Sequence, residues 1–240
     1  FSELSHGKFD ISVGPLVKLW NIGTDKARLP SQEEIDQERQ LVGYKDVMIN
    51  DSEKSVMLNK KGMALDLGGI AKGFAADEII EIFKENNIEH GLVNLGGNVF
   101  AHGKRPNGKL WRIGIQTPTL TRGEYVGVVG VADKTVVTSG IYERYFEEGG
   151  KHYHHILDPH TGYPVENNIA SVTIVGNSSI DADALSTAAF SLGLEEGMKL
   201  IEGLEDTEAI WITKSNEVYV TSGLIDNFEL TNSQFKLIKD

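Results

Sequence analysis

Asp66-Leu67-Gly68-Gly69-Ile70-Ala71-Lys72-Gly73 is the stretch of this sequence that decides its fold. The short apolar run that ends at Leu67 predicts a strand, and the paired glycines predict a sharp turn. From Ile70 the apolar residues recur at helical spacing, so we expect a helix that ends near Asn86. A helix N-terminus that follows glycines offers unpaired N–H groups to a ligand and is a favourable phosphate site. The alternative is an ordinary strand, turn and helix in which Asp66 is a cap.

Strands outnumber helices on both sides of this stretch. Further helices are predicted at 31–42, where Ser31 is the cap, and at 182–192 and 195–201. The predicted strands are 47–50, 56–59, 91–94, a strand that ends at His102, 111–116, 126–132, 153–157, 170–175, 209–213 and 218–221. Because the helices occur singly, without a repeated strand–helix alternation, we predict an α+β fold. The length of 240 residues suits one large domain or two small ones.

Composition excludes several classes of protein. The 240 residues carry 23 Lys and Arg against 35 Asp and Glu, a net charge of −12, and no basic tract. We therefore expect no nucleic-acid partner, because such binding needs clustered cations. The absence of cysteine excludes disulfides, thiolate metal sites and a cysteine nucleophile. No apolar run approaches the roughly 18 residues that span a bilayer, so no transmembrane segment is expected.

A second candidate site is Asp181-Ala182-Asp183-Ala184-Leu185-Ser186-Thr187. Asp183 and Thr187 are four residues apart, so their side chains share one face of the predicted helix. A carboxylate and a hydroxyl are hard oxygen ligands suited to Mg²⁺, which also coordinates substrate phosphates. The alternative is a simple helix start with Asp181 as the N-cap.

Histidines cluster in His152-Tyr153-His154-His155-Ile156-Leu157-Asp158-Pro159, which Thr161-Gly162 follows. Histidine is the natural general base near neutral pH. Neighbouring residues on a strand point to opposite faces, which argues against a zinc site made from adjacent histidines. Asp158 to Gly162 reads as a tight turn. The alternative is a polar strand end with surface histidines.

Thr138-Ser139-Gly140 places a serine beside a glycine after a predicted strand. A nucleophile is one interpretation, but the G-x-S-x-G elbow is absent. A pocket lined by the backbone of Ser139, or a plain turn, fits better.

Taken in order, these motifs closely resemble the ApbE family, the FAD:protein FMN transferases. The resemblance also rests on Phe9–Leu16, which is similar to F-D-P-T-V-G-P-L with Ile11-Ser12 in place of Pro-Thr. The remaining matches are Asp66–Gly73, Asn94-Leu95-Gly96-Gly97-Asn98, Trp111–Ile115, Thr138–Gly140, His155–Gly162 and Ala182–Thr187. The resemblance implies a T-fold-like arrangement of mixed sheets with a few packed helices, in a single domain over residues 1–240.

The resemblance implies Mg²⁺-dependent transfer of FMN from FAD, the substrate, to a Thr or Ser hydroxyl of an acceptor flavoprotein, with release of AMP. The alternatives are a FAD pyrophosphatase, which yields FMN and AMP, and a non-catalytic flavin-binding protein. Breaking a diphosphate needs a divalent ion to offset the developing charge.

Site residues follow from the same resemblance. The metal ligands are Asp183, Thr187 and the backbone carbonyl of Gly69. The FAD contacts are Gly68, Asp66, Lys72, Ser139 and Ile156, the last through its backbone. His155 matches the base that activates the acceptor hydroxyl, and Asp158 either orients that histidine or only shapes the turn. This assignment requires the glycine turn before residue 73 and the Asp183–Thr187 helical turn to meet in space.

The family begins with a further segment that carries Met-Gly-Thr, and nothing before Phe1 corresponds to it. We therefore expect the N-terminal family segment to be missing from this chain. The resemblance implies an extracytoplasmic protein, a membrane-anchored lipoprotein in its full-length form, whose anchor lies outside this sequence.

Overall fold

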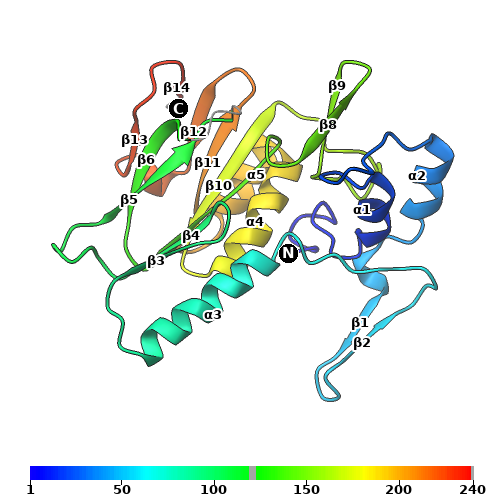
Figure 1. Ribbon diagram of the computed structural model, residues 1–240, viewed down its shortest axis with the longest axis horizontal. Helices are drawn as coiled ribbons and strands as arrows, with labels where there is room; N and C mark the ends of the chain where they lie inside the picture. The colour runs from blue at the N-terminus through cyan, green and yellow to red at the C-terminus, as the bar shows by residue number, and fades with distance from the viewer. Residues whose placement is uncertain (119–122, 239–240) are drawn as a thin grey trace. The chain divides into compact units, whose positions relative to one another are not determined.

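A computed structural model describes residues 1–118 and 123–238 of the protein (Figure 1). The chain divides into two compact units, and each is formed by two segments. The first unit comprises Phe1–Leu67 and Glu143–Glu166, and the second comprises Gly68–Tyr142 and Asn167–Asp240. The predicted single domain over 1–240 stays a prediction.

A seven-stranded sheet forms the centre of the second unit, with the strand order β14-β12-β11-β10-β7-β4-β3. All neighbours are antiparallel except β12 and β14, which pair in parallel. The strands are β3 (Gly91–Asn94), β4 (Asn98–His102), β7 (Lys134–Gly140), β10 (Ile169–Gly176), β11 (Glu208–Thr213), β12 (Glu217–Val220) and β14 (Lys236–Leu237). Every residue of β10 is buried, so this central strand is covered on both faces.

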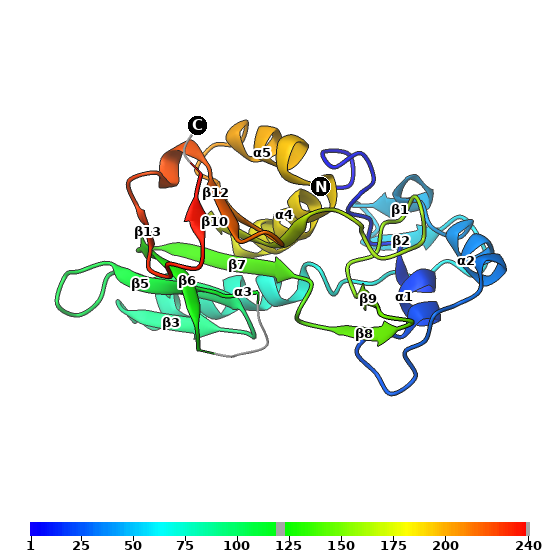
Figure 2. The same ribbon diagram turned by 90° about the horizontal axis from the view of Figure 1, so that it is seen from above.

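Three helices lie on one face of this sheet (Figure 2): α3 (Ala71–Glu85), α4 (Ser179–Leu192) and α5 (Leu194–Glu202). Ten residues of α4 are buried, and most of them are alanine or serine. Small side chains let α4 approach both the sheet and α3 closely, and this close packing positions the candidate site. The cap of α4 is Ser178, which accepts from the N–H of Asp181 at 3.3 Å, so the alternative reading of Asp181 as N-cap is wrong.

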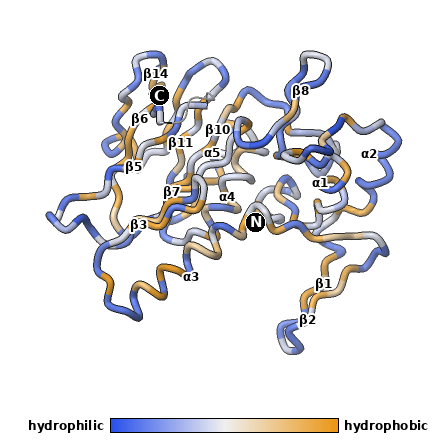
Figure 3. Tube along the Cα trace, viewed as in Figure 1, coloured by the Kyte–Doolittle hydropathy of each residue, from blue (hydrophilic) through white to orange (hydrophobic). Residues whose placement is uncertain are grey.

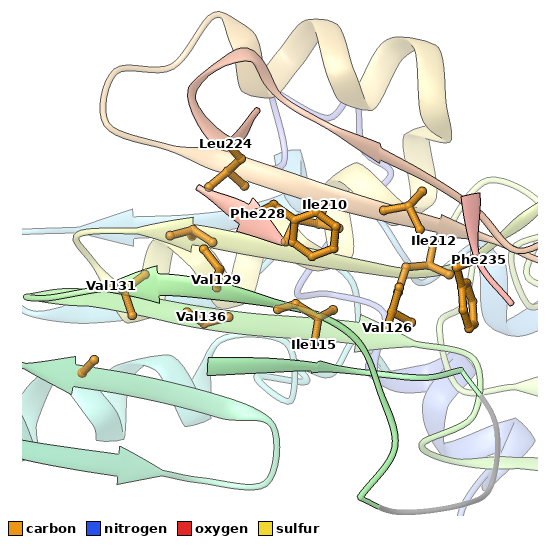
Figure 4. Packing of buried hydrophobic residues seen from close by; sticks show 13 residues of the cluster. Ile115, Val126, Val129, Val131, Val136, Ile210, Ile212, Leu224, Phe228 and Phe235 are labelled. Atoms are coloured by element: carbon orange, nitrogen blue, oxygen red, sulfur yellow. The ribbon is translucent and has the colours of Figure 1, made fainter. Parts of the chain in front are cut away.

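The other face of the sheet is covered by a second, three-stranded sheet with the order β13-β6-β5. Its strands are β5 (Trp111–Gln116), β6 (Tyr125–Val131) and β13 (Phe228–Leu230), and the 3-10 turn η2 (Ser222–Leu224) precedes β13. Aliphatic and aromatic side chains fill the space between the two sheets (Figure 4), among them Ile115, Val129, Val136, Ile210 and Phe228. Burying such a side chain stabilises the fold by roughly 1.5–3 kcal/mol.

The first unit is built from small elements. These are α1 (Gly14–Trp20), α2 (Gln32–Arg39), the 3-10 turn η1 (Tyr44–Asp46), the hairpin β1 (Val47–Asn50) and β2 (Ser55–Leu58), and the hairpin β8 (Tyr145–Glu148) and β9 (Lys151–His154). Both strands of the β1–β2 hairpin are largely exposed, although Figure 3 shows hydrophobic residues along them. The core of this unit surrounds Trp20, whose indole N–H donates to the carbonyl of Gly162 at 2.8 Å.

The predicted α+β class is confirmed, as are most of the elements. Ser31 closes a complete capping box with Glu34, and the strand at 111–116 matches its predicted bounds. The strand at Ala64–Leu67 is wrong, because only Ala64 makes an isolated bridge, to Val13. The strand at 153–157 is misplaced, because β9 ends at His154. The elements α1, β7, β8, β13 and β14 were not predicted.

Candidate active site

The N-terminus of α3 meets the first turns of α4 within the second unit. The backbone N–H of Gly73 donates to Oδ2 of Asp183 at 2.9 Å, so the two segments meet as the sequence analysis required. Gly73 is the third residue of α3, where a helix leaves its N–H without an intrahelical partner. A Cβ atom at residue 73 would lie 2.2 Å from the carbonyl oxygen of Ser179, so only glycine allows this crossing.

Asp77 makes the opposite connection from α3 to α4. Its two carboxylate oxygens accept from the N–H groups of Ser179 and Ile180, both at 2.9 Å. Asp183 therefore caps α3, while Asp77 acts as a second cap of α4 in addition to Ser178, and the helix N-terminus favours a carboxylate in each case. The pair of caps fixes the position of the Asp183 side chain from both helices.

Asp77→Ala is expected to lower the free energy of unfolding by about 2–3 kcal/mol, because two backbone donors lose their acceptors. Urea denaturation followed by circular dichroism measures the change. Asp181→Ala is the matched control: it removes an exposed carboxylate from the same first turn, and should cost under about 1 kcal/mol. Equal losses in the two variants would show that Asp77 does not act as a cap.

Hydroxyl groups continue the site from α4 to strand β7. Oγ of Ser139 lies 2.8 Å from Oγ of Ser186 and 3.2 Å from Oγ1 of Thr187. Ser139 lies within β7 and not after a strand, and its side chain faces α4. The hydroxyl of Ser186 donates to the carbonyl of Asp183 at 2.8 Å. Ser139 and Thr187, which the sequence analysis assigned separately, are thus direct neighbours.

The glycine turn between β3 and β4 completes this group. Nζ of Lys72 lies 3.5 Å from the carbonyl of Gly96, and the N–H of Thr138 donates to the carbonyl of Gly97 at 3.4 Å. Both glycines adopt positive φ, 61° and 92°, which permits this turn. Four sequence motifs, at 68–73, 94–98, 138–140 and 182–187, are therefore joined by hydrogen bonds within the second unit.

Asp183 carries the main electrostatic signal of this group. Burial raises the pKa of its carboxyl above the usual value, while the hydrogen bond from Gly73 and the charge of Lys72 oppose the rise. The side chain is only 4% exposed. A buried carboxylate with a raised pKa is typical of functional sites, because its ionised form is costly until a cation arrives.

The first unit holds the predicted base. Nδ1 of His155 lies 3.2 Å from the carbonyl of Arg144, and the backbone N–H of His155 donates to the same oxygen at 3.1 Å. Because a carbonyl only accepts, Nδ1 must carry the proton, and a neutral ring then has its lone pair on Nε2. This is the tautomer that a general base acting through Nε2 requires.

His154 is in a different situation from its neighbour. The ring is 4% exposed, its Nδ1 accepts from the N–H of Ile156 at 3.3 Å, and its Nε2 donates to the carbonyl of Val165 at 2.9 Å. Both ring nitrogens serve the local backbone, which suits a structural histidine. The geometry therefore supports the choice of His155 over His154, although the catalytic role itself stays a prediction.

Asp158 lies on the turn that follows. Its carboxylate accepts from Nζ of Lys8 at 2.7 Å and from the N–H of His160 at 2.9 Å, and its backbone carbonyl accepts from the N–H of Gly162 at 2.8 Å. These contacts fit a residue that shapes the turn. An orienting effect on His155 stays a prediction.

Two predicted FAD contacts also lie in the first unit. The N–H of Asp66 donates to the carbonyl of Ile11 at 2.7 Å, which holds the backbone of Asp66 beside the Phe9–Leu16 motif. The backbone N–H and carbonyl of Ile156 are both used, toward His154 and Val165. The carbonyl oxygen has a second lone pair for a ligand donor, and the binding role of Ile156 stays a prediction.

Comparison with known proteins identifies the family. Residues 1–211 match the model of the ApbE family. This chain belongs to the ApbE family. It is 38% identical to the FAD:protein FMN transferase of Klebsiella pneumoniae strain 342, over 99% of this chain and 73% of that protein. The enzyme of the same name from Treponema pallidum strain Nichols is also 38% identical, over 99% of this chain and 69% of that protein.

Solved ApbE structures share the fold. The ApbE protein of Thermotoga maritima gives a TM-score of 0.83 at 36% identity, over 93% of this chain and 72% of that chain. The flavin transferase ApbE of Vibrio cholerae gives 0.81 at 29% identity, over 94% of this chain and 72% of that chain. The mixed sheets with packed helices found here are thus the ApbE fold.

The donor set of the second unit of this ApbE chain fits a hard divalent cation. Asp183, Thr187 and the carbonyl of Gly69 offer a carboxylate, a hydroxyl and a peptide oxygen, which are ligands that Mg²⁺ prefers. Across residues 1–118 and 123–238, no group of three or more His, Cys, Asp or Glu side chains is placed to hold a metal ion. The predicted site uses a single carboxylate, so it is not a cluster of that kind.

Sequence reasoning missed two residues of this region, Asp77 and Ser186. A signal for Asp77 was present, because Gly73 and Ala76 are small residues one helical turn apart, the pattern of a close helix crossing, and Asp77 is next to them. Ser186 gave no comparable signal, because a serine inside a helix has many uses.

Proposed function

We propose that this chain transfers FMN from FAD to a Thr or Ser hydroxyl of an acceptor protein, with release of AMP, in a Mg²⁺-dependent reaction. The names of the relatives and membership of the ApbE family support transfer of FMN from FAD. The single observation that carries the metal requirement is the buried Asp183 carboxylate, which is held at the N-terminus of α3 and lies one helical turn before Thr187 in α4.

The chain's own residues account for most of the chemistry in this proposal. The acceptor oxygen bonds to the FMN-side phosphorus, and the bond from that phosphorus to the bridging oxygen breaks. AMP leaves with the bridging oxygen, and Nε2 of His155 takes the hydroxyl proton. The ammonium group of Lys72 binds phosphate oxygens, whereas the backbone N–H groups of Lys72 and Gly73 serve Asp183. A Mg²⁺ ion held by Asp183, Thr187 and the Gly69 carbonyl would offset the charge that develops on the diphosphate.

Mass spectrometry of an acceptor peptide tests this proposal directly. Incubation with FAD, Mg²⁺ and a peptide that contains the acceptor Thr should add one FMN to the peptide and release an equal amount of AMP. Replacing the acceptor Thr by Val in the peptide is the control and should abolish labelling. Loss of FAD to free FMN and AMP at the same rate without peptide would instead establish a pyrophosphatase. Tight FAD binding with no product would establish a flavin-binding protein.

We also propose an extracytoplasmic location, as a membrane-anchored lipoprotein, on the strength of the family resemblance. Among the helices of the described residues, none has the length and apolar character needed to cross a membrane. Labelling intact cells with a membrane-impermeant reagent tests the proposal: accessible protein is expected, and complete protection in intact cells would contradict it.

A further inference from the structure

The hydroxyl groups of Thr187, Ser139 and Ser186 and the backbone carbonyl of Asp183 form a continuous series of hydrogen bonds, which we call the relay. Thr187 contacts Ser139 at 3.2 Å, Ser139 contacts Ser186 at 2.8 Å, and Ser186 contacts the carbonyl of Asp183 at 2.8 Å. Ser139 comes from β7, whereas the other residues belong to α4. Ser186 is fully buried, so its hydroxyl has no access to water.

The direction of each hydrogen bond in the relay follows from counting the hydrogens that its groups can donate. Each hydroxyl has one hydrogen, and a carbonyl has none to give. The hydrogen of Ser186 is therefore used by the carbonyl of Asp183, so the contact between the two serines needs the hydrogen of Ser139. The contact between Ser139 and Thr187 then needs the hydrogen of Thr187. Three contacts and three hydrogens allow only this arrangement.

We propose that Ser139 and Ser186 are positioning residues that fix the hydroxyl of Thr187 as a ligand for the cation. This inference rests on the proposed function, and it concerns how the orientation of the Thr187 hydroxyl is set before a cation binds. With its hydrogen directed to Ser139, the Thr187 oxygen presents lone pairs away from β7. The oxygen needs no rotation before it binds a cation, and its hydrogen does not point at the positive charge.

The arrangement explains why a neutral hydroxyl can serve in this place. A hydroxyl that rotates freely spends part of its time with its hydrogen toward the ion, which weakens binding. Groups that orient a metal ligand are typically worth 10- to 100-fold in affinity. The series of hydrogen bonds ends on the backbone carbonyl of Asp183, and the carboxylate of the same residue is the proposed ligand of the ion. Asp183 therefore contributes to the site through both its backbone and its side chain.

Titration of the full chain with Mn²⁺ alone, followed by electron paramagnetic resonance without FAD, tests the inference. Ser139→Ala should weaken Mn²⁺ binding by roughly 10- to 100-fold. Ser186→Ala should weaken it as well, by a smaller factor. Without the Ser186 oxygen, the Ser139 hydroxyl turns to donate to Thr187, whose own hydrogen then points toward the ion. In the relay, Ser186 acts on Thr187 through Ser139. A loss of Mn²⁺ affinity in Ser186→Ala would therefore not be explained by the loss of a direct contact with the ligand.

Thr173→Val is the matched control for these variants. Thr173 is a fully buried residue of β10 whose hydroxyl lies 2.8 Å from that of Thr138, so its loss removes a hydroxyl pair from the same sheet. The control should leave Mn²⁺ affinity unchanged at a similar cost in melting temperature. Ser139→Thr, which keeps the hydroxyl, should restore most of the affinity.

The possible outcomes separate this inference from the proposed function. Wild-type affinity in Ser139→Ala and Ser186→Ala, with intact binding in the wild type, would overturn the relay and leave the metal site standing. An equal loss of affinity in Thr173→Val would also overturn the relay, because it would show a general structural effect. Absence of saturable Mn²⁺ binding in the wild type would overturn the metal assignment and the relay together.

Discussion

Asp183→Asn is expected to abolish metal-dependent FMN transfer, with a loss on the order of 10³-fold, while the metal-free protein becomes more stable. Asparagine keeps an oxygen for the N–H of Gly73, so the cap of α3 survives. The substitution removes the negative charge that a divalent cation needs and replaces the second carboxylate oxygen by an NH₂ group. Folding and metal binding therefore respond in opposite directions.

The expected stability follows from the raised pKa of Asp183, which burial causes. A raised pKa means that the folded state binds the proton more tightly than the unfolded state, so ionisation of the carboxyl costs stability. The cost is absent below the ordinary value of 3.8 and grows as the pH rises through the folded-state pKa. The asparagine side chain carries no such cost, so the difference between variant and wild type should appear at neutral pH and vanish in acid.

Melting curves across a pH series, with and without Mg²⁺, measure both effects. The wild type should gain stability from Mg²⁺ at neutral pH, and Asp183→Asn should gain none. Asp181→Asn, an exposed carboxylate two residues away, is the control and should respond to Mg²⁺ like the wild type. A Mg²⁺-dependent gain that persists in Asp183→Asn would remove this residue from the metal site.

The family resemblance required the glycine turn before residue 73 and the Asp183–Thr187 turn to meet, and local sequence signals agree with that requirement. Helical periodicity placed Gly73 in the first turn of one helix and Asp183 in the first turns of another. A glycine at one helix start leaves room for a second helix to approach, and a carboxylate is favoured at the positive N-terminal end of a helix. The cap of α4 was misassigned for a local reason, because Ser178 and Asp181 are both good capping residues and only the chain direction before the helix separates them.

Other features depend on tertiary contacts that no local pattern contains. The run 64–67 was predicted as a strand because it is short, mostly apolar and followed by two glycines, yet it makes a single bridge to Val13, and Leu65 and Leu67 are exposed. His154 and His155 are identical in type and adjacent in sequence. Only the carbonyl groups that surround them, from Val165 and Arg144, separate the structural ring from the candidate base. The order of hydrogen donation through Ser139 likewise depends on the contacts between β7 and α4.

His155→Asn should slow FMN transfer by roughly 10²- to 10⁴-fold while FAD binding stays close to that of the wild type. The side-chain nitrogen of asparagine can take the place of Nδ1 and donate to the carbonyl of Arg144, as the histidine does. Asparagine has no basic nitrogen in place of Nε2, so the acceptor hydroxyl loses the group that takes its proton. The substitution therefore removes the proton-accepting atom and keeps the hydrogen bond that holds the side chain.

Single-turnover transfer to the acceptor peptide and FAD titration by fluorescence measure the two quantities independently. His152→Asn is the matched control, since His152 is a partly exposed histidine of β9 that lies three residues before His155. It should leave both the transfer rate and the affinity for FAD unchanged.

Added imidazole should partly restore the rate of His155→Asn, because it supplies the missing base, and should not accelerate the wild type. A His155→Asn rate equal to that of the wild type would assign the base to another residue, whereas a loss of FAD binding without a change in single-turnover rate would make His155 a binding residue.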